Sequence, residues 1–131
     1  MNLFSFACSL DGVHETVINH VSRGKAKARF LIELDMDGIE FTDIKCRKIG
    51  LPATTQRFIN NAEYRNIQFA HCGMMVEVGG EKGWIVGHNS SANLDVLFDK
   101  DSKYGEQVLN CHPNYKIKYF DEKDNLIKSF E

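Results

Sequence analysis

The sequence of 131 residues lacks both a long apolar run and a positively charged leader. Its first ten residues, MNLFSFACSL, are apolar, but Asp11 and Gly12 follow them before a signal peptide or a membrane span could form. We therefore expect no membrane partner and a cytoplasmic protein. In that compartment the four cysteines are expected to be reduced thiols, at Cys8, Cys46, Cys72 and Cys111.

The sequence also lacks a strong excess of charge of either sign. Its net charge of −2 gives no overall attraction to nucleic acid or to anionic lipid. The arginines are unevenly placed, because all of them lie before residue 72, at Arg23, Arg29, Arg47, Arg57 and Arg65. Arginine is well suited to fixed recognition of phosphate or carboxylate, so an anion site is expected in that part of the chain.

No C-x-x-C motif is present, and no local pattern marks an activated thiol. The pairs His71-Cys72 and Cys111-His112, with His88, could in principle form a mixed zinc site. Neighbouring residues of a strand point in opposite directions, which favours buried thiols over ligands. We predict no metal, no cofactor and no catalytic residues. A small Cys/His metal-dependent enzyme stays as an alternative, with metal binding by these two pairs left open.

The second half of the chain has the pattern of short strands joined by tight turns. Three apolar runs, 74–78, 84–86 and 94–98, are separated by Gly-Gly, by Lys-Gly and by a polar His-Asn-Ser-Ser turn. Apolar and polar residues nearly alternate within the runs, which is typical of a small antiparallel barrel. We expect strands near 74–79, 83–88, 93–98, 105–110, 115–120 and 125–130.

The first half mixes helical and extended patterns. Residues 2–8 suit a short strand, and Asp11 could cap a helix that runs to about Ser22. Alternation through residues 25–34 and 39–49 predicts a β-hairpin with a bulge near 42–43, although a helix over 25–34 is the competing interpretation. A second helix is predicted from Thr54 or Thr55 to about Tyr64.

The motif Val76-x-Val78-x-Gly80-x-x-Gly83-x-Ile85-x-Gly87, followed by residues 95–99, resembles SH3-like barrels of the Tudor and KOW types. The predicted fold is therefore α+β. An N-terminal helix–β-hairpin–helix extension (1–72) would pack on a C-terminal five-stranded SH3-like antiparallel barrel (73–131). The resemblance implies binding of peptides, modified side chains or nucleic acid through loops and aromatics at one end of the barrel.

The segments TTQRFINNAEYRNIQFAHCGMMVEV, GWIVGHNSSANLDVLFD and NCHPNYKIKYFD are also similar to small proteins of unknown function from phages and prophages. That resemblance implies a small non-enzymatic binding protein in the cytoplasm of a bacterial host. It would act by stoichiometric binding to a host protein or protein complex, for example as an inhibitor of a host or defence system.

Two surfaces are candidates for binding. The first is the predicted barrel end, where a polar loop and nearby aromatics supply His88, Asn89, Ser90, Ser91, Asn93, Trp84 and Tyr104. This loop could recognise the backbone or a phosphate of a partner. Alternatively, its Asn and Ser side chains could satisfy only the loop's own backbone, with the aromatics acting as packing.

The second surface is a basic run, and it supports nucleic-acid binding as the alternative function. Its cations, with Arg47 close by if the hairpin forms, are Arg23, Lys25, Lys27 and Arg29. An extended chain would place these alternate residues on one side, with Arg29 and Arg47 on paired strands. The surface would face a nucleic-acid backbone or an acidic protein, unless it is simply solvated and balanced by nearby acids.

Overall fold

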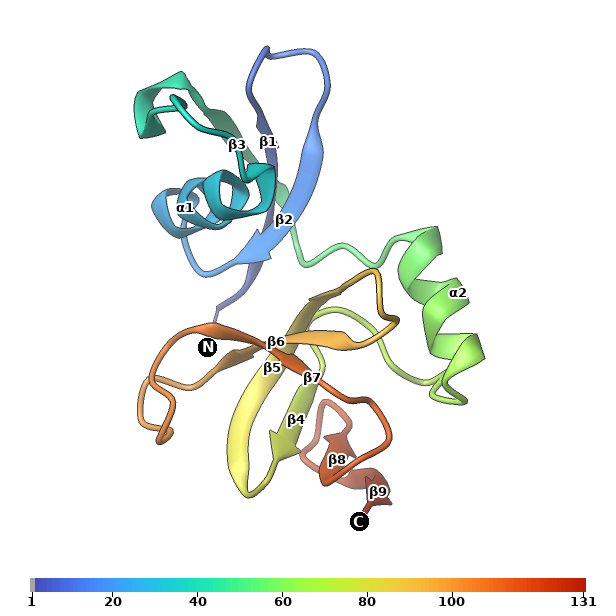
Figure 1. The fold of residues 1–131 in the computed structure, drawn as a ribbon. Helices are drawn as coiled ribbons and strands as arrows, with labels where there is room; N and C mark the ends of the chain where they lie inside the picture. The colour runs from blue at the N-terminus through green and yellow to red at the C-terminus, as the bar shows by residue number, and fades with distance from the viewer. Residues whose placement is uncertain (1) are drawn as a thin grey trace. The chain divides into compact units, whose positions relative to one another are not determined.

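The computed structural model describes residues 2–131. These residues fold as two compact units, one that ends at Ala53 and one that spans Thr54–Glu131. Each unit contains a helix, an antiparallel sheet and a hydrophobic core of its own (Figure 1). The predicted α+β class is confirmed. Neither helix in the described residues is long and apolar enough to cross a membrane.

The N-terminal unit is a three-stranded sheet with one helix against it. In chain order it contains β1 (Phe4–Ser9), β2 (Thr16–His20), α1 (Arg23–Leu34), the 3-10 turn η1 (Phe41–Asp43) and β3 (Lys45–Gly50). Strand β1 lies in the middle and pairs antiparallel with both β2 and β3. Phe6, Cys8 and Ile18 of the sheet pack with Ala26 and Phe30 of α1 to form the core.

Two sequence predictions for this unit are wrong. The helix predicted over 11–22 is absent, because Asp11 caps a turn by accepting hydrogen bonds from the backbone N–H groups of Val13 and His14. The β-branched residues that follow then form β2, in which Val17 pairs with Ala7.

The hairpin predicted over residues 25–49 is the second error. Residues 25–34 lie in α1, so the competing helical interpretation is correct, and residues 42–43 lie in η1 in place of a bulge. The helix begins where Ser22 Oγ accepts from Lys25 N, and it ends at Asp35, whose φ of 47° is left-handed. Lysine, alanine, arginine and leucine are good helix formers. The alternation of polar and apolar residues in this segment therefore does not indicate a strand.

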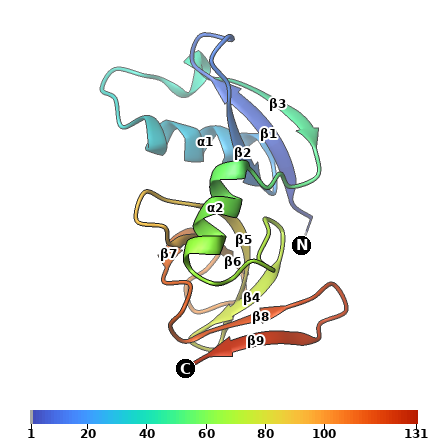
Figure 2. The same cartoon turned by 90° about the vertical axis from the view of Figure 1, so that its right-hand side faces the viewer.

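The C-terminal unit contains one helix and a six-stranded sheet. Its elements are α2 (Gln56–Tyr64), β4 (Met75–Val78), β5 (Glu81–His88), β6 (Leu94–Phe98), β7 (Val108–Cys111), β8 (Ile117–Phe120) and β9 (Leu126–Phe130). The strand order is β7-β6-β5-β4-β8-β9, and every neighbouring pair is antiparallel (Figures 1 and 2). Strands therefore form at all the sites predicted for them. The sheet has six strands, not five, and within the described residues its end strands β7 and β9 do not pair with each other.

Strands β4, β5, β6 and β8 supply the core of this unit. Val76, Ile85, Val96, Ile117 and Tyr119 are fully buried there, and α2 contributes apolar side chains to the same cluster. On β8, Ile117 and Tyr119 are two residues apart, which is the period that places alternate residues on one face of a strand. The core thus anchors both the helix and the β5–β6 loop that surround the candidate site.

Helix α2 is confirmed close to its predicted bounds. Thr55 is the N-cap, and its side-chain oxygen accepts from the backbone N–H of Phe58 at 3.2 Å. Phe58 and Ala62, one helical turn apart, are the buried residues of the helix. This register also decides which side of α2 borders the candidate site.

Candidate binding site

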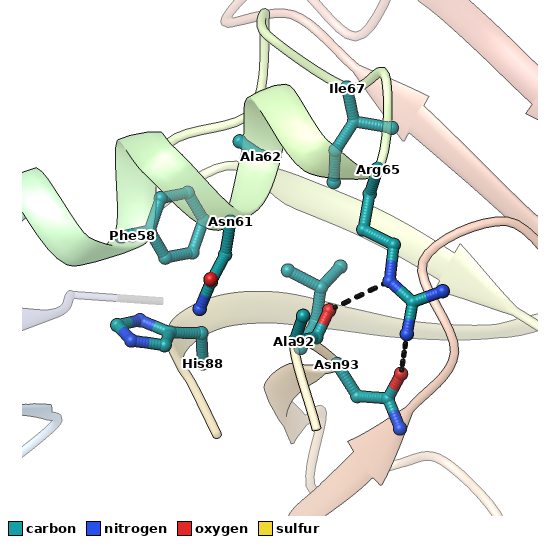
Figure 3. A pocket seen from close by; sticks show the side chains of 9 residues that line it. Phe58, Asn61, Ala62, Arg65, Ile67, His88, Ala92 and Asn93 are labelled. Carbon is teal, nitrogen blue, oxygen red and sulfur yellow. Dashed lines mark hydrogen bonds between the residues drawn. The ribbon is translucent and has the colours of Figure 1, made fainter. Parts of the chain in front are cut away.

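A small pocket, open to solvent, lies between α2 and the loop that joins β5 to β6 (Figure 3). Phe58, Ala62, Ile67 and Leu94 give it an apolar lining, and all four are buried. The remaining lining residues are Asn61, Arg65, His88, Ala92 and Asn93. A few polar groups around an apolar floor are the usual composition of a binding pocket.

The β5–β6 loop is organised by Asn89. Its side-chain oxygen accepts from the backbone N–H groups of Ser91 and Asn93, and its side-chain nitrogen donates to Asp95 at 3.2 Å. Its backbone N–H donates to the Asn93 carbonyl, and its own carbonyl accepts from Ala92 N. The loop therefore has a fixed shape that its own side chain maintains, as in an Asx turn.

Arg65, just after α2, ties this loop to the helix. Its Nε donates to the Ala92 carbonyl at 3.1 Å, and one Nη donates to the Ser91 carbonyl at 3.0 Å and to Asn93 Oδ1 at 3.1 Å. The Arg65 carbonyl in turn accepts from the Asn114 side chain at 2.9 Å. A planar guanidinium that donates along several directions holds both walls of the pocket in one geometry.

His88 and Asn61 present the free hydrogen-bonding groups of the pocket. The His88 ring meets the Phe58 ring edge-on, with centroids 5.8 Å apart, and Asn61 points into the same space from α2 (Figure 3). Within residues 2–131, neither side chain has a hydrogen-bond partner. Burial lowers the pKa of His88, nearby Arg57 lowers it further, and Asp95 opposes the shift. The neutral imidazole at pH 7 offers one donor and one acceptor.

Two of the residues predicted at the barrel end, His88 and Asn93, line the pocket. Ser90 and Ser91 lie exposed in the adjoining loop, and Asn89 is the residue that shapes it. This loop is therefore both a self-satisfied turn and one wall of the pocket.

The predicted aromatic residues lie elsewhere and do not line the pocket. Tyr104 packs edge-on against Phe98, with ring centroids 4.8 Å apart. Trp84 is partly buried on β5, and the Lys82 ammonium lies 5.2 Å from its ring. Both rings thus take part in packing around the sheet.

The one-sided basic strand predicted in the N-terminal unit is not present. Arg23, Lys25, Lys27 and Arg29 lie on α1, where residues two apart point to nearly opposite sides of the helix. Arg29 Nε pairs with Glu33 at 3.2 Å, and the Lys27 ammonium lies 4.4 Å from the Phe41 ring.

Arg47 on β3 is also engaged within the N-terminal unit. Its guanidinium pairs with Glu15 at 2.8 Å, and β3 pairs with β1, not with the segment that carries Arg29. The paired-strand placement of Arg29 and Arg47 was therefore wrong, because residues 25–34 are helical. The cations do not form the aligned surface on which the nucleic-acid alternative was based.

The Cys/His pairs show no metal-binding arrangement. No group of three or more His, Cys, Asp or Glu side chains in the described part of the chain could hold a metal ion. Burial, with a smaller effect of Asp95, raises the pKa of Cys111 to about 11. At neutral pH this sulfur is a protonated thiol and a poor nucleophile.

Seven of the nine lining residues were not identified from the sequence as site residues, among them Phe58, Asn61 and Arg65. The sequence predicts a helix with Phe58, Ile59 and Ala62 inward; Phe58 and Ala62 are buried, but Ile59 is 40% exposed. Asn61 and Arg65 flank the buried face at helical spacing. What the sequence lacked was the contact between the end of α2 and a loop far along the chain. Comparison with protein-family models, with curated proteins and with solved structures found no match to this chain.

Proposed function

We propose that this chain is a small non-enzymatic protein that acts by stoichiometric binding, with its contact surface centred on the pocket between α2 and the β5–β6 loop. One observation carries the proposal. The Asn61 amide and the His88 imidazole have no hydrogen-bond partners in the described chain, and both face an apolar floor. Polar groups placed in this way gain hydrogen bonds when a partner covers them.

The frame around these groups favours binding because it is formed in advance. Arg65 and Asn89 already fix the loop, so a partner would not bear the entropic cost of ordering it. The pocket is too small to enclose a substrate, so a protein partner would cover it and contact its rim. Ile59 and Tyr64, on the same helix, are 40% and 76% exposed and would extend the contact.

We further propose that the partner is a protein or protein complex in the cytoplasm of a bacterial host, with inhibition as the outcome of binding. The phage resemblance of the three segments quoted above supports this proposal. We also propose that the six-stranded sheet is an elaborated relative of the SH3-like barrel. The successive antiparallel pairs β4–β5, β5–β6 and β6–β7 support that kinship, in which loops carry the ligand.

The test is capture from bacterial lysate by the immobilised full chain, with and without nuclease and at moderate salt. We expect one protein or complex to be retained in stoichiometric amount by the original chain. Asn61→Ala should lower the affinity about tenfold, because it leaves the partner's polar group unpaired in the interface. Asn110→Ala is the matched control, since Asn110 is an exposed asparagine on β7 outside the pocket.

Three outcomes decide the matter. Equal loss with Asn61→Ala and Asn110→Ala, or no loss with Asn61→Ala, would remove the pocket from the contact surface. If the captured proteins are lost on nuclease treatment, the chain binds nucleic acid and not a protein partner. A steep fall of affinity with salt would accompany that result.

A further inference from the structure

Cys8 and Cys46 occupy directly opposed positions on two neighbouring strands. Cys8 lies in β1 and Cys46 in β3, and the antiparallel register pairs these two residues with each other. Their sulfur atoms are 2.8 Å apart, although both are free thiols. Figures 1 and 2 show β1 and β3 side by side in both views.

This geometry is close to the geometry that a disulfide requires. Opposed residues of antiparallel strands have Cβ atoms about 4.5–5.5 Å apart. A disulfide needs about 3.5–4.5 Å between the same atoms, with sulfurs about 2.05 Å apart. Closing the bond from the observed separation thus requires a movement of less than about 1 Å, which side-chain torsions and a slight approach of the strands can supply.

The two sulfurs differ in their access to solvent. Cys8 is fully buried, within the core that Phe6, Ile18 and Phe30 help to form. Cys46 is partly exposed, and its thiol lies 3.9 Å from the Arg23 carbonyl, where α1 begins. A reagent in solution therefore reacts with Cys46 first, and the buried Cys8 is the thiol that reacts second.

We propose that Cys8 and Cys46 form a redox modification site, at which a low-molecular-weight disulfide of the glutathione class converts the dithiol to an intramolecular disulfide. The Cys46 thiolate attacks one sulfur of the small disulfide, the bond between its sulfurs breaks, and one small thiol leaves. Cys8 then loses its proton and attacks the Cys46 sulfur, and the second small thiol leaves.

The exchange is balanced in atoms and electrons. The protein loses two hydrogens and two electrons, and the small disulfide gains them as two thiols. Burial raises the pKa of Cys8, and the hydrogen bond to Cys46 raises it further, so the second step is the slower one. The product links β1 to β3 and closes the chain between them, which includes β2, α1 and η1.

The modification should stabilise the N-terminal unit. A cross-link between residues 38 positions apart restricts the unfolded chain far more than the folded one. We therefore expect the oxidised chain to unfold at a temperature several degrees above that of the reduced chain. A thiol pair that merely fills the core would give no such difference.

The experiment treats the reduced full chain with oxidised glutathione, blocks the remaining thiols and maps the peptides by mass spectrometry. The expected product is a cross-linked peptide pair that contains Cys8 and Cys46, with a matching rise in the unfolding temperature. Cys46→Ala should abolish both. Cys111→Ala, which alters a buried cysteine of the other unit, should preserve both.

Peptide mapping of the unmutated chain decides the proposal even if a variant fails to fold. Full recovery of both thiols in reduced form at equilibrium would overturn it. Recovery of Cys46 only as a glutathione adduct, with Cys8 still reduced, would also overturn it. A cross-link that contains Cys72 or Cys111 in place of this pair would have the same meaning.

Discussion

Asn89 illustrates how one side chain can determine the shape of a surface. It contacts the loop through both of its amide atoms and through its backbone, and Asp95 accepts one of its hydrogen bonds. Alanine at this position would leave the Ser91 and Asn93 N–H groups without their acceptor. The substitution would therefore alter the conformation of the loop directly and affect partner binding only through that change.

We expect Asn89→Ala to lower the free energy of unfolding by about 1–2 kcal/mol, because several hydrogen bonds of a partly buried loop are lost together. Urea unfolding at constant temperature measures the difference. Ser90→Ala is the control, since Ser90 is exposed, and it should stay within about 0.5 kcal/mol of the original chain. Equal stability of the two variants would mean that the loop keeps its shape without Asn89.

His88 should make stability depend on pH. Its pKa in the folded chain is lowered from 6.5, so the unfolded chain binds the proton more readily. The contribution of His88 is therefore complete above pH 6.5 and is lost as the pH falls through that value towards the folded pKa. Unfolding free energies at about pH 7.5 and pH 5 should differ more for the original chain than for His88→Gln.

The comparison between these two chains isolates His88 from the other histidines. The contribution of His14 to stability depends on pH in the opposite direction. Its hydrogen bond to Asp11 raises its pKa, so this contribution is lost as the pH rises. That contribution is common to both chains and cancels in the difference. An identical pH dependence of the two chains would show that His88 is not desolvated in the folded state.

At the level of elements, β5 and β6 approach each other closely at Gly83. A Cβ at this position would lie 2.7 Å from Val96 Cγ1 and 3.0 Å from the Leu97 carbonyl oxygen. The carbonyl belongs to the backbone of the neighbouring strand and cannot turn away. The sheet must therefore spread locally to accept any side chain there.

We expect Gly83→Ala to cost about 1–3 kcal/mol of stability through this overpacking. Gly87→Ala is a matched control in the same strand, since its Cβ would meet only Asp95 Oδ2, at 3.7 Å. Thermal unfolding of both variants gives the comparison. A loss of similar size for both would show that the contact with Val96 and Leu97 is not the cause, because the reduced entropy of the unfolded chain on a Gly→Ala exchange would by itself raise stability.

Sequence reasoning succeeded for elements with strong local signals. Thr55 with Phe58 and Ala62 defined α2, and glycine turns with alternating apolar residues defined the strands from β4 to β9. It failed where the pattern fitted both a strand and a helix. In α1, the alternating cations suggested a strand, but lysine, arginine and alanine also favour a helix. For β2, the helix expected after Asp11 gave way to pairing with β1.

The candidate site was half predictable for a related reason. His88 and Asn93 stand in a loop whose polar composition is visible in the sequence. Asn61 and Arg65 belong to the site only because α2 packs beside that loop. Local sequence patterns do not indicate contacts between residues so far apart in the chain.

At the level of the whole molecule, two separate cores support two units. The residues of the two core clusters do not overlap, and the division falls after Ala53. Each core should therefore protect the backbone amides of its own sheet.

We expect Ile117→Ala to speed hydrogen exchange at amides of β4 and β8 while leaving β1 and β2 unchanged, because Ile117 is fully buried in the C-terminal core. Ile44→Ala, in the N-terminal core, should give the reverse pattern. Hydrogen exchange followed by mass spectrometry resolves the two sheets. Loss of protection in both units with either variant would mean that they unfold as one cooperative body.

The strand order of the larger sheet bears on how quickly it can assemble. Four of its five pairings join strands that follow each other in the chain, and these hairpins can form early. The fifth pairs Val76 of β4 with Tyr119 of β8, across a long intervening segment. Closing that segment carries the largest entropic cost of the sheet, so it should set the folding rate. A newly made chain would then wait for β8 before the core around Tyr119 can close.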